Sequence, residues 1–275
     1  MKRRLSPSLY FLIAAAVSTV GVTLRSACML TQFDAAIGYF NLGLLSIAES
    51  AFTALAVIAA VVGTFFFPKD ALPVAPRTPY RPIAAYVLGI ALSAFAVCLA
   101  ADILTADAQT ATDTAKISLT VLASPAAAYF LVTARRHGCY RDALVFLGFF
   151  PIFWSISAVA VIYSDVFVAM NSPIKTSIQM GLLGLMLVIL AELRLRLGKP
   201  ISRKAVALTG LGTYLSLRAS LPLLLTVTVS PSAVYTACAA VLLATGLYGG
   251  YALFCYTRPI ADEPCASDAP IDPIA

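Results

Sequence analysis

The chain is poor in charged residues, which make up 12% of its 275 residues, against about 25% in an ordinary soluble domain. So few charges cannot cover the surface of a soluble protein of this size. Disorder is excluded as well, because hydrophobic residues make up 60% of the chain and would leave too much apolar surface in water. The composition therefore predicts a protein of the lipid bilayer with many membrane-spanning segments.

The sequence also has little of the chemistry that enzymes and metal sites use. It holds a single histidine, His137, and its six cysteines form no C-x-x-C pair. It contains neither G-x-x-x-x-G-K nor H-E-x-x-H, the motifs of P-loop nucleotide sites and of zinc proteases. We therefore expect no enzyme activity, no metal site and no bound cofactor. The 19 basic residues outnumber the 13 acidic ones, but they flank apolar runs, which indicates membrane orientation rather than nucleic-acid binding.

Eight apolar runs reach or approach the length of about 20 residues that a bilayer-crossing helix needs. They cover residues 9–30, 42–67, 83–104, 117–133, 144–163, 177–195, 205–229 and 232–256. The fourth run is the weakest, because it is short, rich in alanine and interrupted by Pro125. We predict an all-α bundle of about eight transmembrane helices. Residues 1–257 form its single membrane domain, and residues 258–275 form a disordered cytoplasmic tail.

The basic residues predict which end of the bundle faces the cytoplasm. If the N-terminus lies inside, only Lys116 and Lys175 fall in outer connections, and every other basic residue outside the runs falls on the inner side. This bias supports the weak fourth run, because its removal would place Arg135 and Arg136 outside. Both termini are therefore expected in the cytoplasm, and the pattern fits a bacterial inner membrane.

Arg218 is the sharpest feature inside the runs, because a charge within the bilayer is costly and usually faces protein or water. It lies near the middle of the seventh run and shares a helix face with Tyr214. Pro222 follows four residues later and has no N–H for the carbonyl of Arg218, so we expect a bend there. A helix of this kind is expected to lie among other helices, because it also carries a polar stripe on the opposite face: Thr209, Thr213, Ser216 and Ser220.

Two further charges, Arg25 and Glu49, fall at similar depth, roughly 5–10 Å below the outer boundary. Because consecutive helices usually pack together, we predict an Arg25–Glu49 ion pair. The alternative is that Glu49 faces a water-filled vestibule. If Arg25 takes Glu49, then Arg218 has no carboxylate at its own depth. The excess cation then indicates a bound anion, water or a cage of carbonyl groups.

Two functions from different classes fit these features. The first is a small secondary transporter or permease for a polar or anionic solute. Its substrate or ion path would include Arg218, Glu49, Arg25, Tyr214 and Ser216. The second is a non-catalytic membrane scaffold or sensor subunit that acts with a partner membrane protein, since no connection is long enough to fold by itself. A cavity that reaches Arg218 favours the transporter, and a solid core favours the scaffold.

Two other patterns concern packing. Near the inner boundary, Glu192 and Arg196 stand four residues apart with the acid first, which is the favourable helical order. Together with Arg194 they are interpreted as anchors at the membrane surface. In the eighth run, Gly246 and Gly250 form a small-xxx-small pair, which permits close approach of another helix of the same chain.

Overall fold

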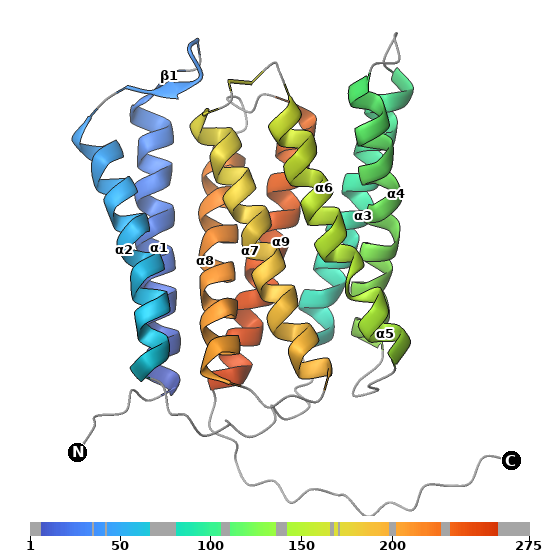
Figure 1. Cartoon of the computed structure of the whole chain (residues 1–275). Helices are drawn as coiled ribbons and strands as arrows, with labels where there is room; N and C mark the ends of the chain where they lie inside the picture. Colours follow the sequence, from blue (N-terminus) through green and yellow to red (C-terminus); the bar gives the residue numbers. More distant parts are fainter. Residues whose placement is uncertain are drawn as a thin grey trace, which may run out of the picture.

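The computed structural model describes residues 7–34, 36–41, 43–66, 81–105, 111–135, 142–165, 168–169, 171–197, 202–226 and 232–257. Its helices are α1 (Pro7–Thr31), α2 (Leu44–Phe66), α3 (Arg81–Thr105), α4 (Ala111–Arg135), α5 (Asp142–Leu147), α6 (Phe150–Ser164), α7 (Pro173–Arg196), α8 (Arg203–Leu225) and α9 (Ala233–Thr257). Two short strands, β1 (Phe33–Asp34) and β2 (Tyr39–Phe40), pair antiparallel between α1 and α2. Figure 1 shows the long helices side by side, with these strands at one end, which we call the hairpin end.

Seven segments of the described chain are long and apolar enough to cross a membrane. They are Ser8–Thr31, Leu44–Val62, Ile83–Thr105, Thr114–Ala134, Leu144–Ser164, Pro173–Arg196 and Ala233–Thr257. The architecture is therefore that of an all-α integral membrane bundle with the lipid bilayer as its surroundings. The remaining predicted run forms α8, which is less apolar and packs against α7, α9, α1 and α2. That α8 also crosses the bilayer, giving eight spans in all, stays a prediction.

Prolines lie where several helices depart from the predicted runs. The fifth run is divided between α5 and α6, and Pro151 stands in the first turn of α6, where its missing N–H interrupts no helical hydrogen bond. α7 begins at Pro173, ahead of the predicted start at residue 177. Pro125 lies inside α4, which nevertheless runs for 25 residues and so exceeds the predicted fourth run. The weakest prediction thus corresponds to a full-length helix.

The two ends of the bundle differ in charge. α1 begins and α9 ends at the end opposite the hairpin (Figure 1). This end, which we call the basic end, carries Arg194 and Arg196 at the close of α7, and Arg203 and Lys204 at the start of α8. It is the end that the sequence predicts to face the cytoplasm, and this orientation stays a prediction. The predicted tail, residues 258–275, and His137 lie outside the described residues.

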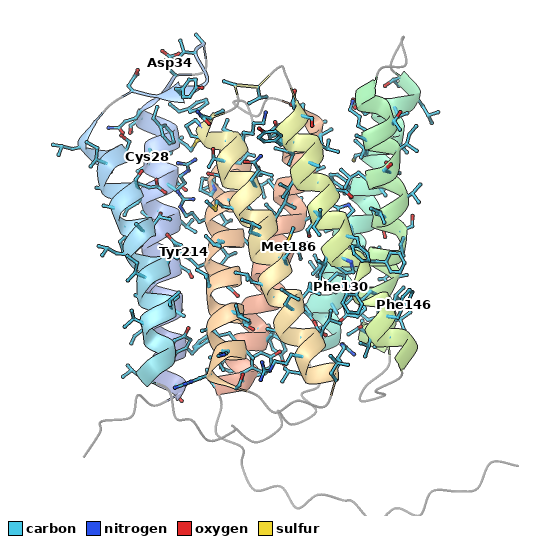
Figure 2. All side chains as sticks on the ribbon, viewed as in Figure 1. Cys28, Asp34, Phe130, Phe146, Met186 and Tyr214 are labelled. Carbon is cyan, nitrogen blue, oxygen red and sulfur yellow. The ribbon has the colours of Figure 1, made fainter. Side chains whose placement is uncertain are left out.

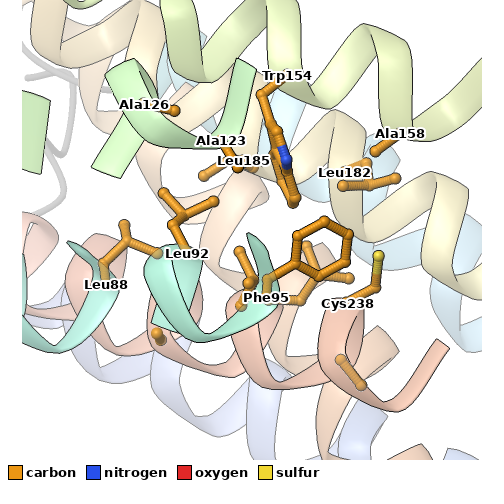
Figure 3. Close-up of a cluster of buried hydrophobic side chains, with 14 of the residues drawn as sticks. Leu88, Leu92, Phe95, Ala123, Ala126, Trp154, Ala158, Leu182, Leu185 and Cys238 are labelled. Carbon is orange, nitrogen blue, oxygen red and sulfur yellow. The ribbon is translucent and has the colours of Figure 1, made fainter. Parts of the chain in front are cut away.

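The main apolar core lies among α3, α4, α6, α7 and α9 and surrounds Trp154. Figure 3 shows this indole beside Phe95, Leu182 and Leu185. The rings of Trp154 and Phe95 meet edge to face with centroids 5.2 Å apart, a favourable aromatic geometry. α2 lies apart from this core. Over the part of α2 whose side chains are described, residues 44–62, the one buried side chain is the charged Glu49.

Lys175 is buried, which corrects its predicted place in an outer connection. Because α7 begins early, Lys175 stands in its first turn. Its ammonium group donates to the backbone carbonyls of Asp165 at 2.8 Å and Val168 at 3.3 Å. The hydroxyl of Tyr235 donates to the carboxylate of Asp165 at 3.1 Å. Lys175 therefore ties the connection after α6 to the start of α7.

Two glycines set the close approach of α7 and α8, and we expect a methyl group at either to destabilise the fold. A Cβ atom on Gly212 would lie 2.5 Å from the carbonyl oxygen of Gly184, and one on Gly184 would lie 2.7 Å from the carbonyl oxygen of Gly212. Gly212→Ala should cost about 1–3 kcal/mol, because overpacking here must move backbone rather than a flexible side chain. Thermal unfolding in detergent measures the loss.

Gly250→Ala is the matched control for this change. The added Cβ atom would meet nothing closer than Cγ2 of Thr213 at 3.6 Å, which is ordinary contact. The control should therefore unfold close to the temperature of the native chain. Equal losses for Gly212→Ala and Gly250→Ala would show that the close approach of α7 and α8 does not limit stability.

Candidate functional site: a buried arginine–glutamate cluster

Three charged side chains meet where α1, α2 and α8 come together. Glu49 of α2 accepts a hydrogen bond through Oε1 from Nε of Arg218 at 2.8 Å, and Nη2 of Arg218 contacts the same oxygen. Its other oxygen, Oε2, lies 3.6 Å from Nη1 of Arg25. The exposed fractions are 5% for Arg25, 2% for Glu49 and 8% for Arg218. We call these residues the arginine–glutamate cluster, and it carries one excess positive charge.

The predicted Arg25–Glu49 ion pair is present, but the prediction that Arg218 has no carboxylate at its own depth is wrong. α8 ends at Leu225, ahead of the predicted end at residue 229. Arg218 therefore lies only about 10 Å from the end of its helix. By the same rise per residue, Glu49 lies about 8 Å and Arg25 about 9 Å from the hairpin ends of α2 and α1. The three charges share one depth, and Glu49 serves both arginines instead of facing a vestibule.

Arg25 is held from three sides. Its Nη2 donates to the backbone carbonyl of Pro173 at 2.7 Å and to the hydroxyl of Ser177 at 2.5 Å, both at the start of α7. Its guanidinium also stacks over the ring of Phe40 in β2, 4.7 Å from the ring centroid. The hairpin is itself joined to α7, since the hydroxyl of Ser172 donates to the carbonyl of Gly38 at 3.1 Å. Arg25 is therefore fixed at the hairpin side of the cluster.

Arg218 is much less fully bonded. A guanidinium has five N–H donors, and within the described chain its acceptors come from Glu49 alone. Nη1, with two N–H groups, has no acceptor among these residues. Among the described residues the fully buried side-chain polar atoms without a partner are Oγ of Ser26, Oγ1 of Thr133 and Nε1 of Trp154, so Nη1 of Arg218 keeps some exposed surface. The unfilled donors of Arg218 are thus suited to the oxygen atoms of an anion or of water.

Tyr214 joins the cluster through a chain of hydroxyl groups. It lies on the side of α8 that faces α1 and α2 (Figure 2), and its hydroxyl donates to Oγ1 of Thr53 at 3.1 Å. Thr53 in turn donates to Oε1 of Glu49 at 3.4 Å. Ser216, the remaining predicted site residue, lies elsewhere. Its hydroxyl donates to the carbonyl of Gly181 at 3.3 Å, which places it between α8 and α7.

A small cavity lies on each side of the cluster. The one toward the hairpin end has a volume of about 10 Å³, borders Arg25, Ser177 and Pro222, and has room for one water molecule. The other, of about 80 Å³, runs from Tyr214 along α1 and α2 toward Tyr10 and the basic end. Neither of these two cavities is lined by Arg218 itself, so neither is the cavity reaching this residue that would favour a transporter. The cluster thus separates two hollow regions of the bundle.

Glu192 is a second buried carboxylate, which corrects its interpretation as a surface anchor. It is 2% exposed, and its Oε1 accepts from Nε of Arg196 at 3.0 Å. The hydroxyl of Tyr248 in α9 donates to its Oε2. Nε of Arg196 also donates to the hydroxyl of Tyr129 in α4 at 2.9 Å. Glu192 and Arg196 pair one acid with one base, and their contacts join α4, α7 and α9. Arg194 is exposed, as an anchor should be.

Several residues that contact the arginine–glutamate cluster carried no signal in the sequence. Ser177, Phe40 and Thr53 are common residue types in unremarkable positions, and Ser177 lies on a helix far along the chain from Arg25. Only the packing of α7 and of the β hairpin brings them to the charges. No protein-family model, curated protein or solved structure matches the chain. What the cluster does must therefore follow from its own side chains.

Proposed function

We propose that the protein is a transporter that carries a small anion across the bilayer without changing it chemically. Arg25 and Arg218 are the groups that bind the anion. The observation that carries the proposal is the cluster itself, in which two buried guanidinium groups share one carboxylate. A buried cation without its own counterion is costly in a membrane, and an anion from solution relieves that cost.

The way Glu49 fits between the arginines indicates the class of anion. A carboxylate already bridges the two guanidinium groups, so the space between them suits a planar group with oxygen acceptors. Guanidinium binds such groups through paired N–H donors. Small carboxylates and planar oxyanions are therefore the proposed substrates, with the unfilled donors on Nη1 of Arg218 as the first point of contact.

The loose attachment of α2 supports transport over a fixed binding site. Glu49 is the one buried side chain among the described side chains of α2. The cluster is therefore the main polar link between α2 and the helices it packs against. An anion that binds Arg25 and Arg218 in place of Glu49 would weaken this link. α2 is therefore the helix proposed to move and to open the cluster to one side of the membrane or the other.

The basic residues at one end of the bundle indicate the orientation and the membrane that we propose for the protein. If this end faces the cytoplasm, the larger cavity beside Tyr214 extends toward the cytoplasmic side and the smaller one beside Arg25 toward the outside. The bacterial inner membrane is the proposed location. The cluster then forms the barrier between the two sides.

Arg218→Met tests the proposal, because methionine keeps a long, unbranched apolar side chain and removes the positive charge. The purified protein is titrated with acetate, lactate, nitrate and chloride, and binding is measured by calorimetry. We expect affinity for the anion that the native chain binds best to fall about 10- to 100-fold, the worth of one or two charged hydrogen bonds. The fold should survive, since the Arg25–Glu49 pair that remains is balanced.

Lys116→Met is the matched control, because it removes one positive charge from a pair with Asp102 near the hairpin end and away from the cluster. It should bind the anion as the native chain does, and vesicles reconstituted with it should take up the anion at the native rate. If the native chain binds none of the four anions, or if Arg218→Met binds them equally well, the transport proposal is wrong.

A scaffold for a partner membrane protein is the second candidate, and one feature favours it. A groove of about 590 Å³ lies between α1, α8 and α9, and small residues form much of its wall. Ala14, Gly210, Gly246 and Gly250 are among them, and small residues permit close packing of membrane helices. Cysteine crosslinking from Leu247, which lines the groove and is exposed, separates the candidates. A specific crosslinked partner together with absent anion binding would favour the scaffold.

A further inference from the structure

We propose that Glu49 takes up a proton when the anion binds, so that the anion and the proton cross the membrane together. This inference rests on the proposed anion transport and adds its coupling ion. It assigns to Glu49 the role of a resident counterion that is neutralised when the substrate arrives, and to Tyr214 and Thr53 the role of delivering the proton.

The charge of the cluster is the first reason. With Glu49 ionised, Arg25 and Arg218 leave one excess positive charge. Binding a monovalent anion alone would bring two anionic groups to the same guanidinium donors, and protonating Glu49 alone would leave two uncompensated cations. When a proton and a monovalent anion bind together, the repulsion between the two anionic groups is removed, and the anion can take over guanidinium donors that Glu49 held.

The positions of the hydrogen-bond donors are the second reason. Arg218 directs two of its nitrogen atoms at Oε1 of Glu49 and none at any other described residue. An anion can gain these donors only if Glu49 gives them up. A protonated carboxyl group is a weaker acceptor and is itself a donor, so it can release Arg218 and donate to the anion.

A path for the proton is the third reason. The cavity of about 80 Å³ borders Tyr214, whose hydroxyl donates to Thr53, and Thr53 donates to Oε1 of Glu49. In the proposed step, a proton from a water molecule that reaches Tyr214 passes to the oxygen of Tyr214 as the proton of Tyr214 moves to Thr53 and that of Thr53 moves to Glu49. The balance is one proton lost by that water and one gained by Glu49. Both hydroxyl groups are then restored by rotation.

The groups that face Glu49 are few. α2 packs against α1 and α8. From α1 come Arg25 and Cys28, which lies within electrostatic range, and from α8 come Arg218 and Tyr214. Glu49 is the carboxylate of this set, so it is the group that a proton neutralises. Proton uptake on anion binding is therefore assigned to Glu49.

Proton uptake can be measured on the native chain. Nitrate is the probe, because it is planar and keeps its charge over the whole range from pH 5 to pH 8. Calorimetric titrations in two buffers with different heats of ionisation give the number of protons taken up per nitrate. We expect uptake of up to one proton, and a nitrate affinity that falls about tenfold per pH unit where Glu49 is ionised in the free protein. Nitrate binding without proton uptake at any pH overturns the inference and leaves anion transport standing.

Glu49→Gln tests whether Glu49 is the residue that takes up the proton. Glutamine resembles the protonated carboxyl group, so nitrate should bind the variant with the same affinity at pH 5 and pH 8 and without proton uptake. Nitrate should also raise the unfolding temperature of this variant, since it supplies the missing negative charge. The same pH dependence in the variant and the native chain would show that another group takes the proton. Absence of nitrate binding in the native chain and the variant alike would overturn this inference, and the proposed function falls with it if acetate, lactate and chloride do not bind either.

Tyr214→Phe tests the path. In vesicles that contain a pH-sensitive dye, an inward nitrate gradient should acidify the lumen through the native chain. Loss of the Tyr214 hydroxyl should slow this acidification about 100-fold, the usual contribution of a positioned proton donor. Tyr163→Phe is the matched control, because Tyr163 is exposed on α6. Equal rates for the two variants would show that the proton reaches Glu49 by another way.

Discussion

Replacing Glu49 with alanine should lower the free energy of unfolding by about 3–5 kcal/mol, the cost of removing one partner from a buried ion pair. Two guanidinium groups would then face each other inside the bilayer without a carboxylate. Arg25 would keep the carbonyl of Pro173 and the hydroxyl of Ser177 as acceptors, but Arg218 would keep none among the described residues. Unfolding in detergent with increasing amounts of SDS measures the loss.

Because the excess charge is positive, removing the carboxylate should destabilise the protein more than removing one of the arginines. Arg218→Met removes a charge from the same cluster but leaves Arg25 and Glu49 as a balanced pair, so its loss should be far smaller than that of Glu49→Ala. The triple change of Arg25, Glu49 and Arg218 to methionine should also be mild, because apolar replacements of a whole buried ionic group are often neutral or stabilising. Similar losses for Glu49→Ala and Arg218→Met would mean that the carboxylate does not serve both arginines.

The second large effect is expected at the other buried carboxylate. Glu192→Ala should also cost about 3–5 kcal/mol, because it removes the carboxylate partner of Arg196 and an acceptor of the Tyr248 hydroxyl. Glu192→Gln should cost less than alanine, since an amide oxygen still accepts from Tyr248. The same SDS titration orders the three proteins by stability.

Arg194→Ala controls for charge at this end of α7. Arg194 is two residues from both Glu192 and Arg196, but it is exposed, and such surface changes usually stay within about 0.5 kcal/mol. If Glu192→Ala were as mild as Arg194→Ala, Glu192 would be a surface anchor after all. The two carboxylates also differ in the charge that their removal leaves behind. Glu49→Ala leaves two arginines without this carboxylate, and Glu192→Ala leaves one.

Apolar runs in the sequence predicted the helices well, and the similar depth of Arg25 and Glu49 on consecutive runs predicted that they meet. The run that became α8 was extended over Thr226 and the valine- and threonine-rich residues after it, because hydropathy does not show where a helix ends. That error moved Arg218 toward the middle of the membrane and hid its contact with Glu49. Lys175 was misplaced for the opposite reason, since α7 starts before its apolar run does.

The partners of the charges could not be predicted at all. Phe40 reaches Arg25 because a short hairpin folds back over the end of α1, and Tyr248 reaches Glu192 because α9 packs against α7. These contacts depend on which helix faces are adjacent in three dimensions. Periodicity in one helix gives the direction of a side chain but not the identity of the neighbour it meets.

The order of the charges along the chain has a consequence for synthesis at the membrane. Arg25 and Glu49 lie on consecutive helices, so they can enter the bilayer as a balanced pair before α7 and α8 are made. α7 follows with the carbonyl and hydroxyl groups that hold Arg25, and Arg218 arrives on the next helix, α8. The costly extra cation is thus inserted only after its carboxylate is already in place. A nascent chain that stops before α8 holds a balanced pair, and it gains the excess positive charge only when α8 is added.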